Sequence, residues 1–302
     1  CLGWGTMDDT CAGPRRMKIR LEQDQIRIND GTQDVLTYAC AADSFKPYVK
    51  ELRSPNGRNI LLDSPSDHVH HHGLMLAYKA DGVNFWEETP ESGFQRQHQP
   101  IEAWAEPQAQ ASRAGLAIGI HWQNPKGALV LQEERSVEVL AGAKHQAHLL
   151  TWATCLQAGQ SGKAVTLAGD HYFGLGMRFD RGMDKTGRFI NATEQAGTVF
   201  RGDERLAQGH WCAYLAELEG QPVTVAMFDY PKNLRPVTWF TMKTPFAYLA
   251  ATLKLHEQSY TLPADQKLVL RYGVAVWDGH THARRIEETY RAWLRQSVKD
   301  GD

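Results

Sequence analysis

Residues Met17–Tyr38 read M-K-I-R-L-E-Q-D-Q-I-R-I-N-D-G-T-Q-D-V-L-T-Y. On both sides of the polar segment Glu22–Gln25, Ile or Leu alternates with Arg, which is the period of a half-buried β-strand. Asn29–Gly31 (N-D-G) is a turn signal, and the apolar run Val35–Tyr38 follows it. The stretch therefore predicts a β-hairpin at the start of a β-rich domain.

Similar short runs, bounded by Pro, Gly, Asn and Asp, recur along the chain. They predict strands at Gly115–His121, Ala128–Gln132, Ser136–Leu140, His145–Cys155, Ala164–Ala168, Val223–Phe228, Phe246–Leu255 and Leu268–Trp277. In His282–Val298 the apolar residues recur every three to four positions, which predicts one amphipathic helix. Many strands and one helix indicate a mostly β fold, a large antiparallel β-sandwich with a C-terminal helix.

The composition is that of an ordinary globular protein. The 302 residues carry a formal net charge of -2, and 42% are hydrophobic and 23% charged. No basic tract indicates nucleic-acid binding, and no apolar run approaches the roughly 20 residues of a membrane span. We expect residues 17–302 to form one soluble domain with no nucleic-acid partner, and the sequence does not indicate an oligomeric state.

The first sixteen residues stand outside this pattern, so we expect residues 1–16 to be a leader or a poorly structured segment. The cysteines lack C-x-x-C spacing, and their odd number fits a reducing compartment; they are Cys1, Cys11, Cys40, Cys155 and Cys212. We therefore expect a cytoplasmic protein. The alternative is a periplasmic protein or a lipoprotein with Cys1 as its lipidated mature N-terminus.

The stretch Asp67–Gly73, D-H-V-H-H-H-G, places four histidines within five positions. If it is an extended strand, His68, His70 and His72 share one face. Histidine binds metals, transfers protons and hydrogen-bonds hydroxyl groups near neutral pH. An apolar run follows the cluster, which favours a functional site over the alternative of a surface patch.

Two more blocks combine polar and aromatic residues. Trp86 stands between Asn84 and Glu88 on one face of an expected strand, a pattern typical of ring stacking on a sugar; a core Trp is the alternative. In the block Gly169–Phe179, His171 is a candidate general acid or base, and Arg178 is a candidate partner for carboxylate or oxyanion charge. A hydrogen-bonded structural histidine and a core ion pair are the respective alternatives.

The segment Phe228–Pro236 ends a strand and then forms a turn between two prolines. Such a rigid turn would present Asn233 and Arg235 with little loss of entropy. Ordinary turn chemistry also explains Asn233.

In their shared order, these blocks resemble a family of unknown function labelled "methane oxygenase PmoA". The resemblance runs from about Tyr48 to Gly279. The blocks that carry it are Lys46–Glu51, Leu52–Gly57, Asp67–Leu74, Gly82–Trp86, Trp211–Cys212, Phe228–Pro236, Trp239, Pro245–Phe246, Leu270–Tyr272 and Asp278–Gly279. The resemblance implies a β-rich protein of a family whose members accompany sugar-processing enzymes, and the absent membrane span excludes a methane monooxygenase.

Asp67–His70 and Asp170–Phe173 are also similar to the N-H-x-H and N-H-x-Y-F stretches of galactose mutarotases, which implies a mutarotase-like supersandwich. The chain departs from the PmoA-labelled family at Tyr230, where the family usually has His, and Phe240 is a second departure. If those positions carry a proton or bind a metal in the family, the activity differs here.

The leading hypothesis is a carbohydrate-active enzyme of epimerase, lyase or hydrolase type, acting on a small sugar or an oxidised sugar. His70 and His171 would transfer protons, and Arg178 and Arg235 would bind carboxylate or enolate charge. Trp86 would stack on the ring, while Asn233 and Glu88 would hold hydroxyl groups.

Two alternatives remain. His68, His70 and His72 could bind a divalent metal, with Glu88 completing the ligand set. The chain could also be a sugar-binding module without catalysis.

Overall fold

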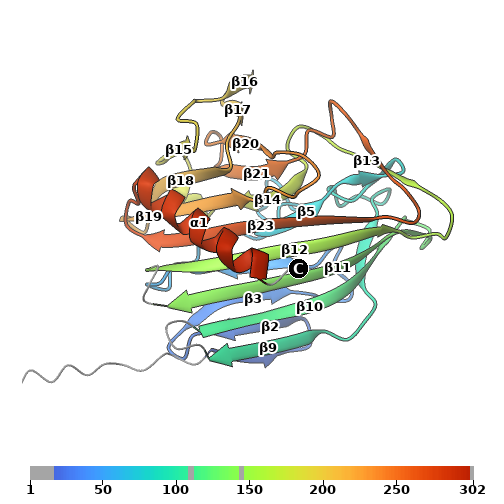
Figure 1. Cartoon of the computed structure of the whole chain (residues 1–302), viewed down its shortest axis with the longest axis horizontal. Helices are drawn as coiled ribbons and strands as arrows, with labels where there is room; N and C mark the ends of the chain where they lie inside the picture. The colour runs from blue at the N-terminus through green and yellow to red at the C-terminus, as the bar shows by residue number, and fades with distance from the viewer. Residues whose placement is uncertain (1–16, 108–111, 143–145, 300–302) are drawn as a thin grey trace, which may run out of the picture.

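Two large antiparallel sheets stack face to face, and one long helix lies across the outside of one of them (Figure 1). The computed structural model describes residues 17–107, 112–142 and 146–299. The expected large antiparallel β-sandwich with a C-terminal helix is confirmed. The leader expected at residues 1–16 lies outside the described residues. No helix in these ranges is long and apolar enough to cross a membrane.

The ten-stranded sheet carries strands from both halves of the chain. Its order is β1 (Lys18–Leu21), β2 (Gln25–Asn29), β3 (Asp34–Ala39), β4 (Tyr48–Leu52), β5 (Leu74–Ala77), β14 (Gly174–Arg178), β21 (Tyr248–Thr252), β20 (Thr238–Met242), β17 (Glu204–Ala207) and β16 (Thr198–Arg201). The hairpin predicted from Met17–Tyr38 forms the β1–β2–β3 edge of this sheet.

The nine-stranded sheet holds the longest strands. Its order is β15 (Arg188–Asn191), β18 (Trp211–Leu218), β19 (Gln221–Asp229), β23 (Lys267–Asp278), β12 (Ala147–Ala158), β11 (Leu129–Gly142), β10 (Ser112–Gln123) and β8 (Phe94–Gln97), with β9 (Glu102–Pro107) also paired to β10. A small third sheet contains β22 (Tyr260–Leu262), β13 (Val165–Ala168), β6 (Lys79–Ala80) and β7 (Val83–Asn84).

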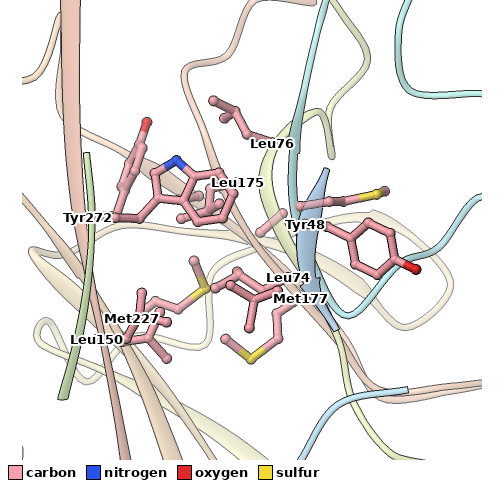
Figure 2. Packing of buried hydrophobic residues seen from close by; sticks show 14 of the residues in the cluster. Tyr48, Leu74, Leu76, Leu150, Leu175, Met177, Met227 and Tyr272 are labelled. Atoms are coloured by element: carbon pink, nitrogen blue, oxygen red, sulfur yellow. The ribbon is translucent and has the colours of Figure 1, made fainter. Parts of the chain in front are cut away.

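The core lies between the two large sheets, where alternate residues of each strand point inward. Figure 2 shows Leu175 and Met177 of β14 facing Leu150 of β12 and Met227 of β19. These four side chains are fully buried. The intervening residues of β14 point to the outer face of the ten-stranded sheet, which is the face that carries the candidate site.

The helix α1 (Ala283–Lys299) matches the predicted segment His282–Val298 within one residue at each end. It covers the outer face of the nine-stranded sheet (Figure 1) through Ile286, Tyr290 and Trp293. A Cβ on Gly273 would lie only 2.9 Å from the Trp293 ring, so the missing side chain allows this close approach.

The prediction of separate strands at Ala128–Gln132 and Ser136–Leu140 is wrong, because β11 runs without a break through both. The charged stretch between them resembles a turn, but Glu133 and Arg135 both point into the core and are fully buried. The expected strand start at His145 lies outside the described residues, and β12 begins at Ala147.

Glu133 and Arg135 form a bidentate ion pair inside the sandwich, with Nε–Oε1 and Nη2–Oε2 distances of 2.8 Å. The other guanidinium donors reach the Tyr38 hydroxyl, the Pro47 carbonyl and Gln95 Oε1, so all five N–H groups are used. The carboxylate also accepts hydrogen bonds from the Trp122 indole and the Thr154 hydroxyl. The pair therefore links β11 to strands of both sheets.

We expect Arg135→Met to lower the free energy of unfolding by about 3–5 kcal/mol, because it leaves the Glu133 carboxylate buried and unpaired. Replacing both residues, Arg135→Met with Glu133→Leu, should restore most of this loss. Arg284→Met is the control, since it breaks only the exposed pair with Glu288 and should cost less than about 1 kcal/mol. Urea denaturation measures all three, and a loss under 1 kcal/mol for Arg135→Met would contradict the assignment.

Candidate functional site

The histidine cluster lies in a loop rather than on a strand, so the prediction that His68, His70 and His72 share a strand face is wrong. Two consecutive turns span Pro65–His71, in which the His68 amide donates to the Pro65 carbonyl and the His71 amide donates to the His68 carbonyl, and His72 forms only an isolated β-bridge with Asp63. These local hydrogen bonds replace a strand ladder, and they direct neighbouring imidazoles to different surroundings.

His72 lies away from the other three histidines, in a network of buried and half-buried polar groups. Its Nδ1 is 2.8 Å from Asp63 Oδ1, and its Nε2 is 2.9 Å from Glu88 Oε1. Lys46 donates to the same Glu88 oxygen at 2.6 Å, and the Tyr48 ring stacks on His72. Burial disfavours the charge on His72, but the two carboxylates outweigh that effect and raise its pKa.

This arrangement does not match the proposed set of metal ligands. His68 and His71 stack at 4.6 Å between ring centroids and His70 meets them edge-on, whereas both ring nitrogens of His72 are engaged elsewhere. Among residues 17–107, 112–142 and 146–299, no three His, Cys, Asp or Glu side chains are grouped so that they could hold a metal ion.

A cavity of about 400 Å³ opens on the outer face of the ten-stranded sheet, beside the histidine loop. Its lining residues are His68, His70, His71, Glu87, Tyr172, Arg201, Glu204, Phe240, Met242, Pro245, Phe246 and Tyr248. Strand alternation places Glu204 of β17, Phe240 of β20 and Tyr248 of β21 on this one face. Loops from the N-terminal half of the chain supply the opposite wall.

Two histidine–carboxylate pairs border this cavity. On the loop side, His70 Nδ1 is 3.2 Å from Glu87 Oε2, and burial lowers the pKa of His70. On the sheet side, His171 Nε2 is 3.2 Å from Glu204 Oε2, while His171 Nδ1 is 2.6 Å from Asp170 Oδ1.

His171 itself is only 4% exposed, so Glu204 is the member of the second pair that lines the cavity. Arg201 donates to the other Glu204 oxygen at 2.7 Å, and the Phe200 ring stacks on the His171 imidazole. Both carboxylate oxygens are therefore held in place.

Aromatic side chains form much of the remaining surface. Tyr172 meets Trp86 edge-on, and burial together with nearby carboxylates raises the pKa of Tyr172 to about 12. Deeper in the wall, His71 contacts Phe246 and Tyr248, and burial lowers its pKa to about 2, so this imidazole is neutral at pH 7.

Several of the other predicted site residues do not line the cavity. Trp86 is fully buried and stacks on Phe173, so its ring is not open to a sugar. Glu88 is held by Lys46 and His72 outside the cavity lining.

Asn233 and Arg235 also lie outside the cavity lining. Asn233 donates to Asp229 and to the Arg271 carbonyl, so it has the structural role in the turn that was the alternative in the sequence analysis. Arg235 donates to the Gln258 carbonyl at 3.2 Å. Of the two positions that depart from the resembled family, Phe240 lines the cavity, whereas Tyr230 packs near Trp293 of α1.

Sequence reasoning missed Glu87, Arg201, Glu204 and Tyr248. Glu87 follows Trp86 directly and could have been included with the same block. Arg201 and Glu204 lie in a short hairpin of the exposed strand β16 and the partly buried strand β17, and in the sequence its charged residues look like those of any surface hairpin.

We expect the stability of the protein to fall between pH 7 and pH 5, partly because of His71. Its pKa is lowered in the folded state. Below about pH 6.5, the ordinary pKa of histidine, the unfolded chain therefore binds a proton that the folded protein does not bind, and the free energy of unfolding falls. In His71→Gln this contribution is absent. Between pH 7 and pH 5 its free energy of unfolding should therefore fall by about 1–2 kcal/mol less than that of the wild type. Urea denaturation at several pH values measures the difference, with the exposed His280→Gln as control; parallel profiles for wild type and His71→Gln would contradict the assignment.

Comparison with solved structures finds a similar fold within alpha-galactosidases. The GH36 alpha-galactosidase AgaB from Geobacillus stearothermophilus is 12% identical, with a TM-score of 0.54 over 91% of this chain and 42% of its own. The galactosidase domain of the alpha-galactosidase-sucrose kinase AgaSK is 10% identical, with a TM-score of 0.50 over 87% of this chain and 42% of its own. The chain thus spans about two-fifths of the length of these proteins, and the likeness shows the fold alone.

A search of curated protein sequences gave no match. Residues 25–291 match a family of unknown function (DUF6807), which agrees with the expectation of such a family, and none of the comparisons supports the methane-oxygenase label. Because the match covers most of the chain, the protein belongs to the DUF6807 family.

Proposed function

We propose that this protein acts on a sugar or an oxidised sugar by acid/base chemistry in the cavity beside the histidine loop. The observation that carries the proposal is the presence of two histidine–carboxylate pairs, His70–Glu87 and His171–Glu204, around one cavity. Epimerisation, elimination and hydrolysis at a glycosidic carbon each need one group that takes a proton and another that gives one.

The chain Asp170–His171–Glu204 suits proton transfer. A neutral imidazole has one N–H, so it can donate to Asp170 or to Glu204 but not to both. The contact at 3.2 Å would be a second hydrogen bond only with a further proton, on the imidazole or on Glu204. Glu204 would exchange this proton with the substrate, and His171 would act behind it as a positioning and proton-holding residue.

The His70–Glu87 pair would supply the complementary group on the loop side. Burial lowers the pKa of His70, which favours the neutral imidazole and therefore a role as proton acceptor. Tyr172 and Phe240 provide apolar ring surface between the two walls, of the kind that packs against the C–H face of a sugar.

The fold supports the same class of substrate without identifying it. The solved structures described above are named as alpha-galactosidases. A second hollow of about 450 Å³, on the outer face of the nine-stranded sheet near Glu102 and Cys155, is lined by no histidine and offers no comparable pair.

We expect Glu204→Gln to lower turnover by about 100-fold or more, because the amide keeps the shape of the side chain but cannot exchange a proton with the substrate. A panel of sugars and keto-sugars, with products detected by mass spectrometry, first identifies the substrate. His171→Ala should cause a loss of about the same order while the fold survives, and Glu217→Gln, an exposed carboxylate on β18, is the control. Unchanged turnover in Glu204→Gln would remove this residue from the mechanism, and a panel without any product would remove the catalytic proposal.

A further inference from the structure

Several buried polar atoms next to the cavity have no hydrogen-bond partner within the described ranges. They are Tyr248 OH, His71 Nδ1, and Nε and Nη1 of Arg178. The three residues are 2%, 6% and 2% exposed, so bulk water does not replace the missing partners. Buried polar groups are normally paired, and a cluster of unpaired ones beside a cavity indicates a ligand that completes them.

Arg178 is the most unusual of the three, because it is a buried cation without a hydrogen-bonded counter-ion among the described residues, and Asp184 and Asp67 act on it only as nearby charges. Its ion pair with Asp67 is long, at 3.6 Å from Nη2, and the Asp67 side chain is 44% exposed. By contrast, the other fully buried guanidinium, that of Arg135, uses all its donors. A buried charge without a close counter-ion is costly, and a bound anion would relieve that cost.

The geometry of the sheet brings Arg178 and Tyr248 together. They are direct cross-strand partners in the β14–β21 ladder and lie on its outer face, so their Cβ atoms are about 5 Å apart. Tyr248 and His71 line the cavity, as does Phe246, whose ring centroid is 3.6 Å from Arg178 Cζ. Stacking on Phe246 covers one face of the guanidinium and leaves its N–H edge, in the plane of the group, for an acceptor.

We infer that this end of the cavity binds the carboxylate of an acidic sugar, with Arg178 and Tyr248 as its hydrogen-bond donors. The inference rests on the proposed function, whose substrate class it narrows from sugars in general to sugars that carry a carboxylate. Guanidinium and phenol both donate, so a carboxylate satisfies them together, whereas the hydroxymethyl group of a neutral sugar leaves the guanidinium without a counter-charge. The neutral His71 beside them can accept a hydrogen bond from a sugar hydroxyl.

Isothermal titration of the whole chain with matched probes tests the inference. D-galacturonate and D-glucuronate are compared with D-galactose and D-glucose, which differ from them only at the carboxylate. We expect each acid to bind about tenfold or more tightly than its neutral counterpart, as expected for hydrogen bonds to a charged group. Equal affinities would overturn the inference, and so would inorganic phosphate binding as tightly as the uronates, since the site would then be a general anion site.

Two variants test whether Arg178 and Tyr248 cause the preference for uronates over neutral sugars. Arg178→Met should abolish it, and Tyr248→Phe should reduce uronate affinity several-fold without lowering the melting temperature of the free protein, because the hydroxyl it removes has no partner. Arg181→Met is the matched control, since Arg181 also approaches Asp67 but is 61% exposed, and it should keep the preference. If Arg178→Met does not fold, the uronate affinity of Tyr248→Phe decides between the outcomes, and an affinity equal to that of the wild type would overturn the inference.

The outcomes separate this inference from the proposed function. If neutral sugars bind and uronates do not, the carboxylate subsite is wrong while the sugar site stands. If uronates bind with the expected preference but no product forms, the subsite stands and the catalytic proposal fails. If no sugar of either kind binds, both are overturned.

Discussion

The buried ion pair between Glu133 and Arg135 is a constraint that both sheets of the sandwich must satisfy. A charged pair inside an apolar core is tolerated only when its geometry is good and its remaining donors and acceptors are satisfied. Here the guanidinium uses all five donors, and its partners include Tyr38 and the Pro47 carbonyl beside the ten-stranded sheet and Gln95 beside the nine-stranded sheet. The pair therefore joins the two sheets through hydrogen bonds, and the cavity lies on the outer face of one of them.

Beside the cavity, in contrast, buried polar groups lack hydrogen-bond partners in the part of the chain that the structure describes. On the outer face of the ten-stranded sheet, Arg178 and Tyr248 are buried, and polar atoms of both side chains have no hydrogen-bond partner among the described residues. A Cβ on Gly176 would lie 2.2 Å from the Tyr248 hydroxyl, so a glycine is what allows this side chain to lie flat against the sheet. The Glu133–Arg135 pair is fully satisfied, whereas Arg178 and Tyr248 beside the cavity are not, and unsatisfied groups of this kind are what a bound ligand would complete.

The sequence predicted the architecture well and the site only in part. Alternation in Met17–Tyr38 and the helical spacing in His282–Val298 report directly on burial, so the β-sandwich and its helix followed from local pattern. A prediction from such patterns takes charged residues to face water. The charged residues Glu133 and Arg135, which point into the core, therefore look like a break between two strands. The site depends on long-range pairing: Glu204 meets His171 across 33 positions of sequence, and no local signal marks that contact. Trp86, in contrast, was correctly recognised as unusual but lies beneath the site, buried among other rings.

A crystal structure of the protein grown with D-galacturonate would test the central claim most directly, that the cavity beside the histidine loop is a sugar site. The account predicts a sugar in this cavity, with a hydroxyl or ring atom within hydrogen-bond distance of Glu204 and of His70, and with its carboxylate toward Arg178 and Tyr248. A sugar bound at another surface, or a cavity that holds only water at saturating ligand, would contradict it.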